Sequence, residues 1–285
     1  MKKRVVALII IMLALNACDG SAAETVETPL EVESTEVVEQ PTPSPAPEVP
    51  AGCSPLPELE PVDLVEVIPQ PVTFGPEEGQ ATFSGTLYGS GPVGIVLSHM
   101  GVPGTDQTSW RSFAEVAAAR GYMVLTYDLL GFGQSVGAAP TPSPRGNLTF
   151  GLETALEFIR SQGAERIIVI GASMGGSASI AVAADNTHDD IIGVGILAAS
   201  RGQPMFIPGD ELSALTMPSL WVSAEGDSVA ADMEEMFEAA GSADKELCIY
   251  PSILNHATGI FATAYGPDLE HRLLAFIERA VSESE

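Results

Sequence analysis

The stretch that decides the fold is RIIVIGASMGG, residues 166–176. Its first half is an apolar run suited to a buried strand, residues 171–175 fit the pattern G-x-S-x-G, and small residues typical of a helix follow. The glycines permit a sharp turn between strand and helix, which lifts the hydroxyl of Ser173 clear of the sheet. The same turn points the first N–H groups of the helix toward an oxyanion forming at that hydroxyl. A role for Ser173 as a helix cap only is the alternative.

From about residue 71 onward, the chain alternates short apolar runs with helical patterns. Strands are expected at 80–88, 93–98, 122–127, 166–170, 191–198, 218–223 and 246–250, and helices at 109–120, 148–160, 174–184, 230–240 and 269–281. The first of these strands is expected to be exposed. This alternation predicts a mostly parallel central sheet covered by helices on both faces.

Two further blocks accompany the turn at Ser173. Residues 95–101 read IVLSHMG and precede Trp110, and residues 127–135 read YDLLGFGQS, which fits D-x-x-G-x-G-x-S. Together with the turn, in this order, they resemble the α/β-hydrolase family over roughly residues 71–285. The resemblance implies the α/β-hydrolase fold and a catalytic triad in the chain order Ser, acid, His.

The resemblance also implies an oxyanion hole, with the N–H of Met174 as one donor. The family has Gly directly after its loop histidine, whereas Met100 follows His99 in this chain and Gly101 comes next. The second donor is therefore expected to be the N–H of Met100, with that of Gly101 as the alternative. His99 itself is expected either to line the substrate pocket or to be structural.

The acid and the base of the triad are expected after the last strands. Asp227 lies in a loop after the strand at 218–223, with Glu225 and Asp232 as rivals and helix capping as its alternative role. His256 follows the strand at 246–250, where the family places its catalytic histidine. Two other histidines are expected at the surface: His188 and His271.

These residues predict a serine hydrolase that cleaves carboxylic ester bonds through an acyl-enzyme, without cofactor or metal. The connection at 199–217, where family members often insert a lid, is short, so the lid is expected to be short or absent. Met205 and Phe206, with Arg201 and Ile207, are expected to line a shallow pocket there. Other enzymes on the same triad, a peptidase or an acyltransferase, and a non-catalytic binding lipoprotein are the alternatives.

The N-terminal region has the pattern of an exported lipoprotein. Three basic residues precede an apolar run at 5–15, and the sequence LNAC at 15–18 resembles the bacterial lipobox, which implies lipidation of Cys18. Residues 1–18 are thus expected to be a signal peptide. Residues 19–66 are expected to be a disordered acidic, Pro-rich tether, and 67–285 the catalytic domain. The protein is expected outside the cytoplasm, anchored to the bacterial cell membrane by its lipid.

Charge and cysteine content complete the prediction. The formal net charge is −26, and such an acidic surface excludes nucleic acid as a partner. The expected partners are a small-molecule or polymeric ester and the membrane, and nothing in the sequence indicates an oligomeric state. Cys53 and Cys248 are expected either to form a disulfide, as two thiols do outside the cytoplasm, or to leave Cys248 as a buried thiol.

Overall fold

The computed structural model describes residues 50, 52–76, 79–140, 143–185, 187–202 and 207–285. The chain divides into two units, residues 1–46 and 47–285, and only the second contains described residues. The expected signal peptide and Cys18 therefore lie outside the described residues, as do Met205 and Phe206.

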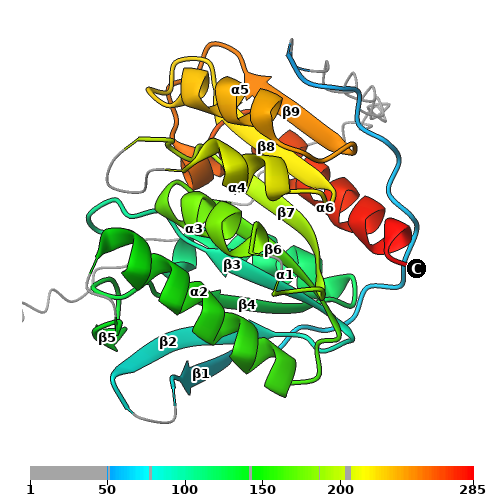
Figure 1. Cartoon of the computed structure of the whole chain (residues 1–285). Coiled ribbons are helices and arrows are strands. Elements are labelled where there is room, and N and C mark those ends of the chain that lie inside the picture. Colours follow the sequence, from blue (N-terminus) through cyan, green and yellow to red (C-terminus); the bar gives the residue numbers. More distant parts are fainter. Residues whose placement is uncertain (1–49, 51, 77–78, 141–142, 186, 203–206) are drawn as a thin grey trace, which may run out of the picture. The chain divides into compact units, whose positions relative to one another are not determined.

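The second unit is built from strands and helices that alternate along the chain (Figure 1). The strands are β1 (Gln70–Phe74), β2 (Ala81–Tyr88), β3 (Val93–Ser98), β4 (Met123–Tyr127), β5 (Val136–Gly137), β6 (Arg166–Ala172), β7 (Ile191–Leu197), β8 (Ser219–Ala224) and β9 (Lys245–Tyr250). The α-helices are α1 (Arg111–Ala119), α2 (Pro144–Ser161), α3 (Met174–Ala183), α4 (Gly209–Ala214), α5 (Ala230–Ala239) and α6 (Gly266–Glu283), and the 3₁₀ helices are η1 (Gln107–Trp110) and η2 (Ala257–Ala262).

The sheet has the order β1-β2-β4-β3-β6-β7-β8-β9, and β5 pairs with β2 outside this path. Every neighbouring pair from β4 to β9 is parallel, whereas β1 and β2 are antiparallel additions at one edge. Because β6 lies in the middle and is buried on both faces, its apolar run needs no alternation. The carboxyl ends of the parallel strands meet at one edge of the sheet, where sites of open α/β sheets form.

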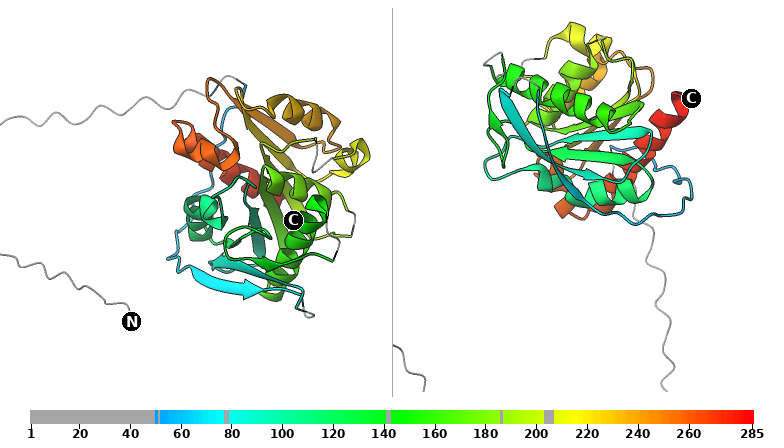
Figure 2. Two further views of the ribbon diagram at one scale, coloured as in Figure 1. Left: turned by 90° about the vertical axis from the view of Figure 1, so that its left-hand side faces the viewer. Right: turned by 90° about the horizontal axis from the view of Figure 1, so that it is seen from below.

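Helices cover both faces of this sheet (Figures 1 and 2). One apolar core contains side chains of α2, α3 and α5, such as Leu152, Ile180 and Met233, packed against the sheet. The other core contains side chains of α1 and α6, such as Phe113 and Phe276. The prediction of a mostly parallel sheet between two helical layers is confirmed.

Several boundaries differ from those expected. Helix α2 begins at Pro144 rather than at 148, because the Ser143 hydroxyl accepts a hydrogen bond from Gly146 N–H and Pro144 takes the first helical position. Strand β2, expected to be exposed, alternates buried and less buried residues, since β1 and β4 flank it. Strand β1 and the short helix α4 were not anticipated.

Part of the expected tether is in contact with the rest of the second unit. Residues 52–68, here called the N-terminal strap, are bound along the second unit and run beside α6 in Figure 1. The buried guanidinium of Arg272 donates to the Ser54 carbonyl at 2.9 Å, and the His271 ring donates to that of Pro57 at 2.8 Å. Val65 N–H donates to the Ala119 carbonyl at 2.8 Å. These hydrogen bonds use the backbone of the strap, which explains why its acidic, Pro-rich side chains resemble a tether.

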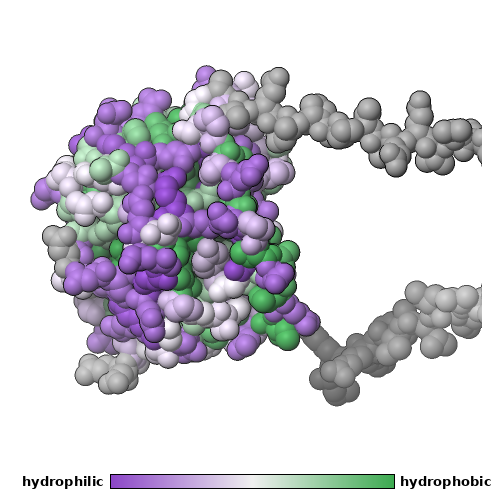
Figure 3. Space-filling model, turned by 90° about the vertical axis from the view of Figure 1, so that its right-hand side faces the viewer, coloured by the Kyte–Doolittle hydropathy of each residue, from purple (hydrophilic) through white to green (hydrophobic). Residues whose placement is uncertain are grey.

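A disulfide joins Cys53 at the start of the strap to Cys248 in β9, with 4.3 Å between their Cα atoms. Cys248 is buried, and the Ile249 N–H points at the Gly52 carbonyl at 3.4 Å, so the strap covers part of the exposed edge of β9. The side of the molecule that carries the strap and the end of α6 is largely hydrophilic (Figure 3). Apolar residues of the strap that are exposed are Val62, Leu64, Val65 and Ile68.

Candidate active site

Ser173 lies in the sharp turn between β6 and α3, with φ 52° and ψ −114°. Residues other than Gly rarely adopt this backbone conformation. Here it is maintained by close packing of the turn against its neighbours. A Cβ on Gly171 would lie 2.1 Å from the Gly175 carbonyl oxygen, and one on Gly175 would lie 2.5 Å from that of Ser98. The two glycines are therefore required by the turn, and the turn is pressed against the end of β3.

His256 and Asp227 form the hydrogen-bonded pair that a triad requires. Asp227 follows β8 and His256 follows β9, and the His256 Nδ1 lies 2.7 Å from the Asp227 Oδ2. The Asp227 side chain is 4% exposed, while that of His256 is 30% exposed and can be reached from solvent. The second oxygen of Asp227 accepts a hydrogen bond from Val229 N–H at 3.3 Å, just before α5. The carboxylate therefore also stabilises the turn in which it lies.

The two rival acids have other partners. Glu225 accepts a hydrogen bond from Ser252 N–H at 2.9 Å. Asp232 accepts from the Ser200 hydroxyl at 3.2 Å and from Arg201 N–H at 3.0 Å, and so holds the segment after β7. Of the three carboxylates, Asp227 is the one bonded to His256. The other two histidines lie elsewhere: His188 pairs with Glu153, and His271 binds the strap.

Backbone strain is concentrated around this site. Besides Ser173, positive φ values occur at Ala198 (51°), directly after β7, and at Ala257 (46°), directly after His256. Ser173 N–H donates to the Leu197 carbonyl at 2.7 Å, which ties the turn to the end of β7. Strained residues persist only where the surrounding structure fixes them, and they cluster at functional sites.

Among the described residues, no hydrogen bond joins the Ser173 hydroxyl to the His256 ring. Catalytic hydrogen bonds of this kind are often long in the absence of substrate and tighten when it binds. The structure thus contains the hydrogen-bonded His256–Asp227 pair and the strained Ser173, without a hydrogen bond between Ser173 and His256.

The segments that carry the expected oxyanion donors are in contact. A Cβ on Gly101 would lie 1.9 Å from the Met174 sulfur, so the loop after β3 contacts the first residue of α3. Within the described part of the chain, the N–H groups of Met100, Gly101 and Met174 donate no hydrogen bond. They are available to an oxyanion, and the geometry does not choose between Met100 and Gly101.

Of the two roles expected for His99, its surroundings support the structural one. Its side chain is fully buried, its Nδ1 lies 2.7 Å from the Met100 carbonyl oxygen, and its Nε2 accepts from Leu129 N–H at 3.0 Å. These partners require a neutral ring with its proton on Nδ1. Burial lowers the pKa of His99, which favours the same neutral form. His99 therefore braces the loop after β3 against the turn after β4.

Sequence reasoning missed the residue that fastens this loop from its other end, Gln107. Its N–H donates to the Asp128 carboxylate at 3.0 Å, and its side-chain oxygen accepts from the Thr126 hydroxyl at 2.9 Å. The other oxygen of Asp128 accepts from Gln134 N–H at 2.8 Å. The D-x-x-G-x-G-x-S block is thus a structural clamp around a buried carboxylate. The sequence signal for this clamp is Asp128, an aspartate at the end of a buried strand.

A pocket of about 420 Å³ adjoins the turn at Ser173. It is lined by Leu130, Phe132, Ala138, Ser143, Pro144, Asn147, Leu148 and Met174.

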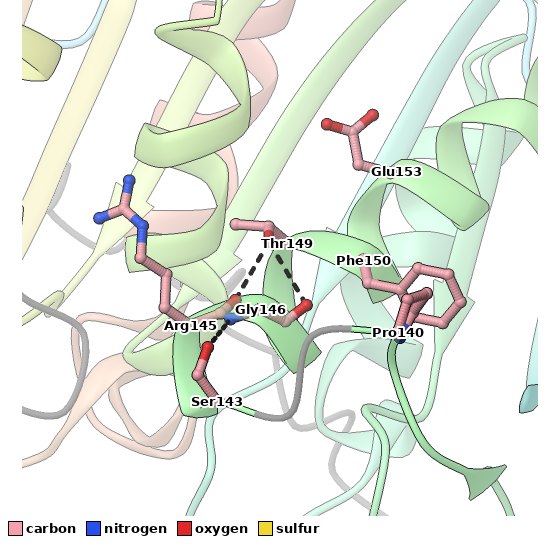
Figure 4. A pocket seen from close by; sticks show the side chains of 7 residues that line it. All are labelled: Pro140, Ser143, Arg145, Gly146, Thr149, Phe150 and Glu153. Atoms are coloured by element: carbon pink, nitrogen blue, oxygen red, sulfur yellow. Dashed lines mark hydrogen bonds between the residues drawn. The ribbon is translucent and has the colours of Figure 1, made fainter.

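A second pocket of similar volume lies along α2, where Arg145 and Glu153 project from the helix (Figure 4). Of the other residues expected to line a pocket, Ile207 is buried and Arg201 pairs with Glu235. In the described ranges, no group of three or more His, Cys, Asp or Glu side chains could hold a metal ion.

Comparison with known proteins agrees with this geometry. Residues 95–275 match the model of a family described as the alpha/beta hydrolase family. An esterase from Thermogutta terrifontis superposes with a TM-score of 0.58 at 15% identity, covering 74% of this chain and 99% of that one. A Pyrococcus furiosus esterase (TM-score 0.60, 16% identity, 74% and 92% covered) and a Mycobacterium smegmatis proline iminopeptidase (0.60, 13%, 76% and 100%) are also similar. No curated protein sequence matches the chain. At these identities, the structural likeness supports the fold alone.

Proposed function

The chain belongs to the alpha/beta hydrolase family, and we propose that it is a serine hydrolase that cleaves carboxylic esters through an acyl-enzyme. The observation that carries the proposal is the 2.7 Å contact between His256 Nδ1 and Asp227 Oδ2, at the same sheet edge as the strained Ser173. A buried carboxylate bonded to one ring nitrogen leaves the other nitrogen of a partly exposed histidine to act as a base.

The proposed chemistry follows from these positions. In the neutral form of the His256 ring, Nδ1–H donates to Asp227, and Nε2 accepts the proton of the Ser173 hydroxyl as its oxygen attacks the ester carbonyl. The resulting oxyanion accepts hydrogen bonds from the N–H of Met174 and that of Met100 or Gly101. The imidazolium then gives its proton to the leaving alcohol, and a water molecule, activated by the same histidine, releases the acid and regenerates the serine.

The decisive experiment is labelling of the purified protein with a fluorophosphonate probe, together with hydrolysis of a p-nitrophenyl ester. Ser173→Ala and His256→Ala are expected to lower the turnover number on the order of 10⁶-fold. Asp227→Asn is expected to cost about 10⁴-fold, because it disturbs the tautomer and orientation of the base. Glu225→Gln is the matched control and is expected to keep most of the activity. Wild-type labelling of Ser173→Ala, or a larger loss from Glu225→Gln than from Asp227→Asn, contradicts the triad.

Other enzymes on the same triad are separated by substrate. A panel of matched ester, amide and thioester compounds is expected to show the ester as the best substrate. An amide turned over faster than the ester indicates a peptidase, and transfer of the acyl group to an added alcohol in preference to water indicates an acyltransferase. A protein that binds the probe compounds without labelling or turnover is the non-catalytic lipoprotein.

We also propose that the protein is exported and held at the bacterial cell membrane by lipid on Cys18. The basic start, the apolar run and the sequence LNAC support this. The Cys53–Cys248 disulfide adds support, because disulfides persist outside the cytoplasm. None of the helices in the described ranges is long and apolar enough to cross a membrane. Cells fed a radioactive fatty acid are expected to label the wild type and not Cys18→Ala, and equal labelling of both contradicts the anchor.

A further inference from the structure

Met174 brings a thioether sulfur next to the nucleophile. It is the first residue of α3, directly after Ser173, and its side chain is half-buried. It also lines the pocket of about 420 Å³ beside the turn, so small solutes can reach it. Three other methionines of the described ranges are buried and out of their reach: Met123, Met233 and Met236.

The sulfur of Met174 faces the backbone of the neighbouring loop. Of the atoms around a Cβ built on Gly101, the Met174 sulfur is the nearest at 1.9 Å, ahead of the Cε at 3.0 Å and the Cγ at 3.1 Å. The sulfur therefore packs against the Gly101 Cα, and an atom added on that side has no room unless the loop moves. Within the described residues this sulfur accepts no hydrogen bond, whereas that of Met233 accepts one from Ala199 N–H at 3.2 Å.

Oxidation is the reaction open to such a sulfur. Cys53 and Cys248 are already joined in a disulfide, which leaves the thioethers as the oxidisable sulfur atoms of the described chain. In the reaction with hydrogen peroxide, a lone pair of the sulfur attacks one peroxide oxygen, and the O–O bond breaks. The sulfur is oxidised by two electrons and keeps that oxygen as a sulfoxide. The departing oxygen takes up the proton of the transferred one and leaves as water.

We propose that Met174 is a site of reversible oxidation, at which a peroxide converts the thioether to a sulfoxide and thereby stops hydrolysis. The effect on hydrolysis rests on the proposed function. A sulfoxide is bulkier than a thioether and polar, so it cannot keep the packing between α3 and the loop after β3. That loop carries the N–H groups of Met100 and Gly101, one of which is the expected second oxyanion donor. Because loss of one such donor costs about 10²–10³-fold in turnover, its displacement is expected to cost at least about tenfold.

The test uses hydrogen peroxide on the full-length protein. Trypsin cuts after Arg166 and Arg201, and the peptide of residues 167–201 contains Met174 as its one methionine. The gain of one oxygen atom by this peptide in mass spectrometry therefore measures oxidation at this site. Hydrolysis of p-nitrophenyl acetate is followed in the same samples, as a fraction of the rate before treatment. The wild-type rate is expected to fall at least about tenfold in step with oxidation of the peptide. The two methionine sulfoxide reductases, one for each epimer, are expected to restore it.

Three leucine variants show which sulfur is responsible. Leu has nearly the volume of Met and no sulfur, so Met174→Leu is expected to lose less than about twofold of its own untreated rate in peroxide. Met217→Leu is the matched control, because it makes the same change at another half-buried methionine, ahead of β8. Met100→Leu makes the change in the loop after β3. Both of these variants are expected to be inactivated by peroxide as strongly as the wild type.

Several outcomes overturn the inference. They are a rate loss undiminished in Met174→Leu, protection by Met100→Leu instead, and full activity in protein whose 167–201 peptide is completely oxidised. If Met174→Leu does not fold, the wild type decides through the agreement between oxidation and rate and through recovery with the reductases. Absence of any Ser173-dependent hydrolysis before treatment overturns the proposed function instead. The oxidation site is then judged by peptides alone: 167–201 is expected to be oxidised before 121–145, which contains the buried Met123, and the reverse order overturns it.

Discussion

Removal of the Cys53–Cys248 disulfide by Cys53→Ser is expected to destabilise the protein strongly without touching the site. The two cysteines are 195 residues apart, so the bridge closes most of the described chain into one loop. For a loop of this length, the chain-entropy relation gives about 18 cal/mol/K, or about 5 kcal/mol at 25 °C. This value is an upper figure, because native bridges often contribute less, and we expect a loss of about 3–5 kcal/mol. Cys248 is left as a buried thiol, which needs no partner.

Thermal unfolding followed by circular dichroism measures this loss. For a domain of this size, each kcal/mol corresponds to about 2–4 °C, so the midpoint is expected to fall by about 6–20 °C. A reducing agent is expected to lower the midpoint of the wild type by a similar amount and to leave that of Cys53→Ser unchanged, which is the internal control. Hydrolysis rates at 25 °C are expected to stay near wild type. If Cys53→Ser and oxidised wild type unfold within about 1 kcal/mol of each other, the loop-closure reasoning is refuted.

Three further changes test the packing and the ion pairs of the fold. Gly175→Ala puts a Cβ 2.5 Å from the Ser98 carbonyl oxygen, so probe labelling is expected to slow at least about 100-fold or stability to fall by about 1–3 kcal/mol, and unchanged values of both disprove the crowding. Asp128→Asn replaces one of the two oxygens that accept N–H groups, and urea unfolding is expected to show a loss of about 1–3 kcal/mol. The Arg160 guanidinium lowers the pKa of Asp190, so that pair stabilises the protein fully above about pH 4 and loses its effect as pH falls through the lowered pKa. Asp190→Asn is therefore expected to cost about 1 kcal/mol at pH 7 and nothing in strong acid, and a cost independent of pH contradicts this.

The centre of the fold was predictable from sequence because its signals are local. An apolar run, the G-x-S-x-G pattern and a small-residue helix are contiguous at 166–184, and the structure places β6, the turn and α3 there. The pairing of Asp227 with His256 could be expected only through the family order of the triad, since 29 residues separate them.

The features that escaped prediction depend on distant partners. The strap carries acidic and proline residues, and apart from Cys53 much of what holds it is backbone hydrogen bonding to residues such as Arg272 and Ala119, which its side chains do not reveal. Strand β1 is mostly exposed, so it lacks the apolar signal of the inner strands. The structural role of His99 follows from the Leu129 N–H and the Met100 carbonyl, and the sequence of the loop does not reveal whether the histidine ring faces a substrate or the backbone.

The disulfide also determines how the protein responds to mechanical load. A pull on the chain ahead of residue 50 reaches Cys53 before it reaches the rest of the strap, and the covalent bond passes it to Cys248 in β9. That strand is paired along its length with β8, from Lys245 to Tyr250, so the force meets a row of parallel hydrogen bonds rather than the few contacts of residues 54–68. The contacts of the strap therefore do not carry this force and do not break one after another. A protease that cuts ahead of Gly52 would, for the same reason, set free a domain whose covalent loop and whose Ser173, Asp227 and His256 are all intact.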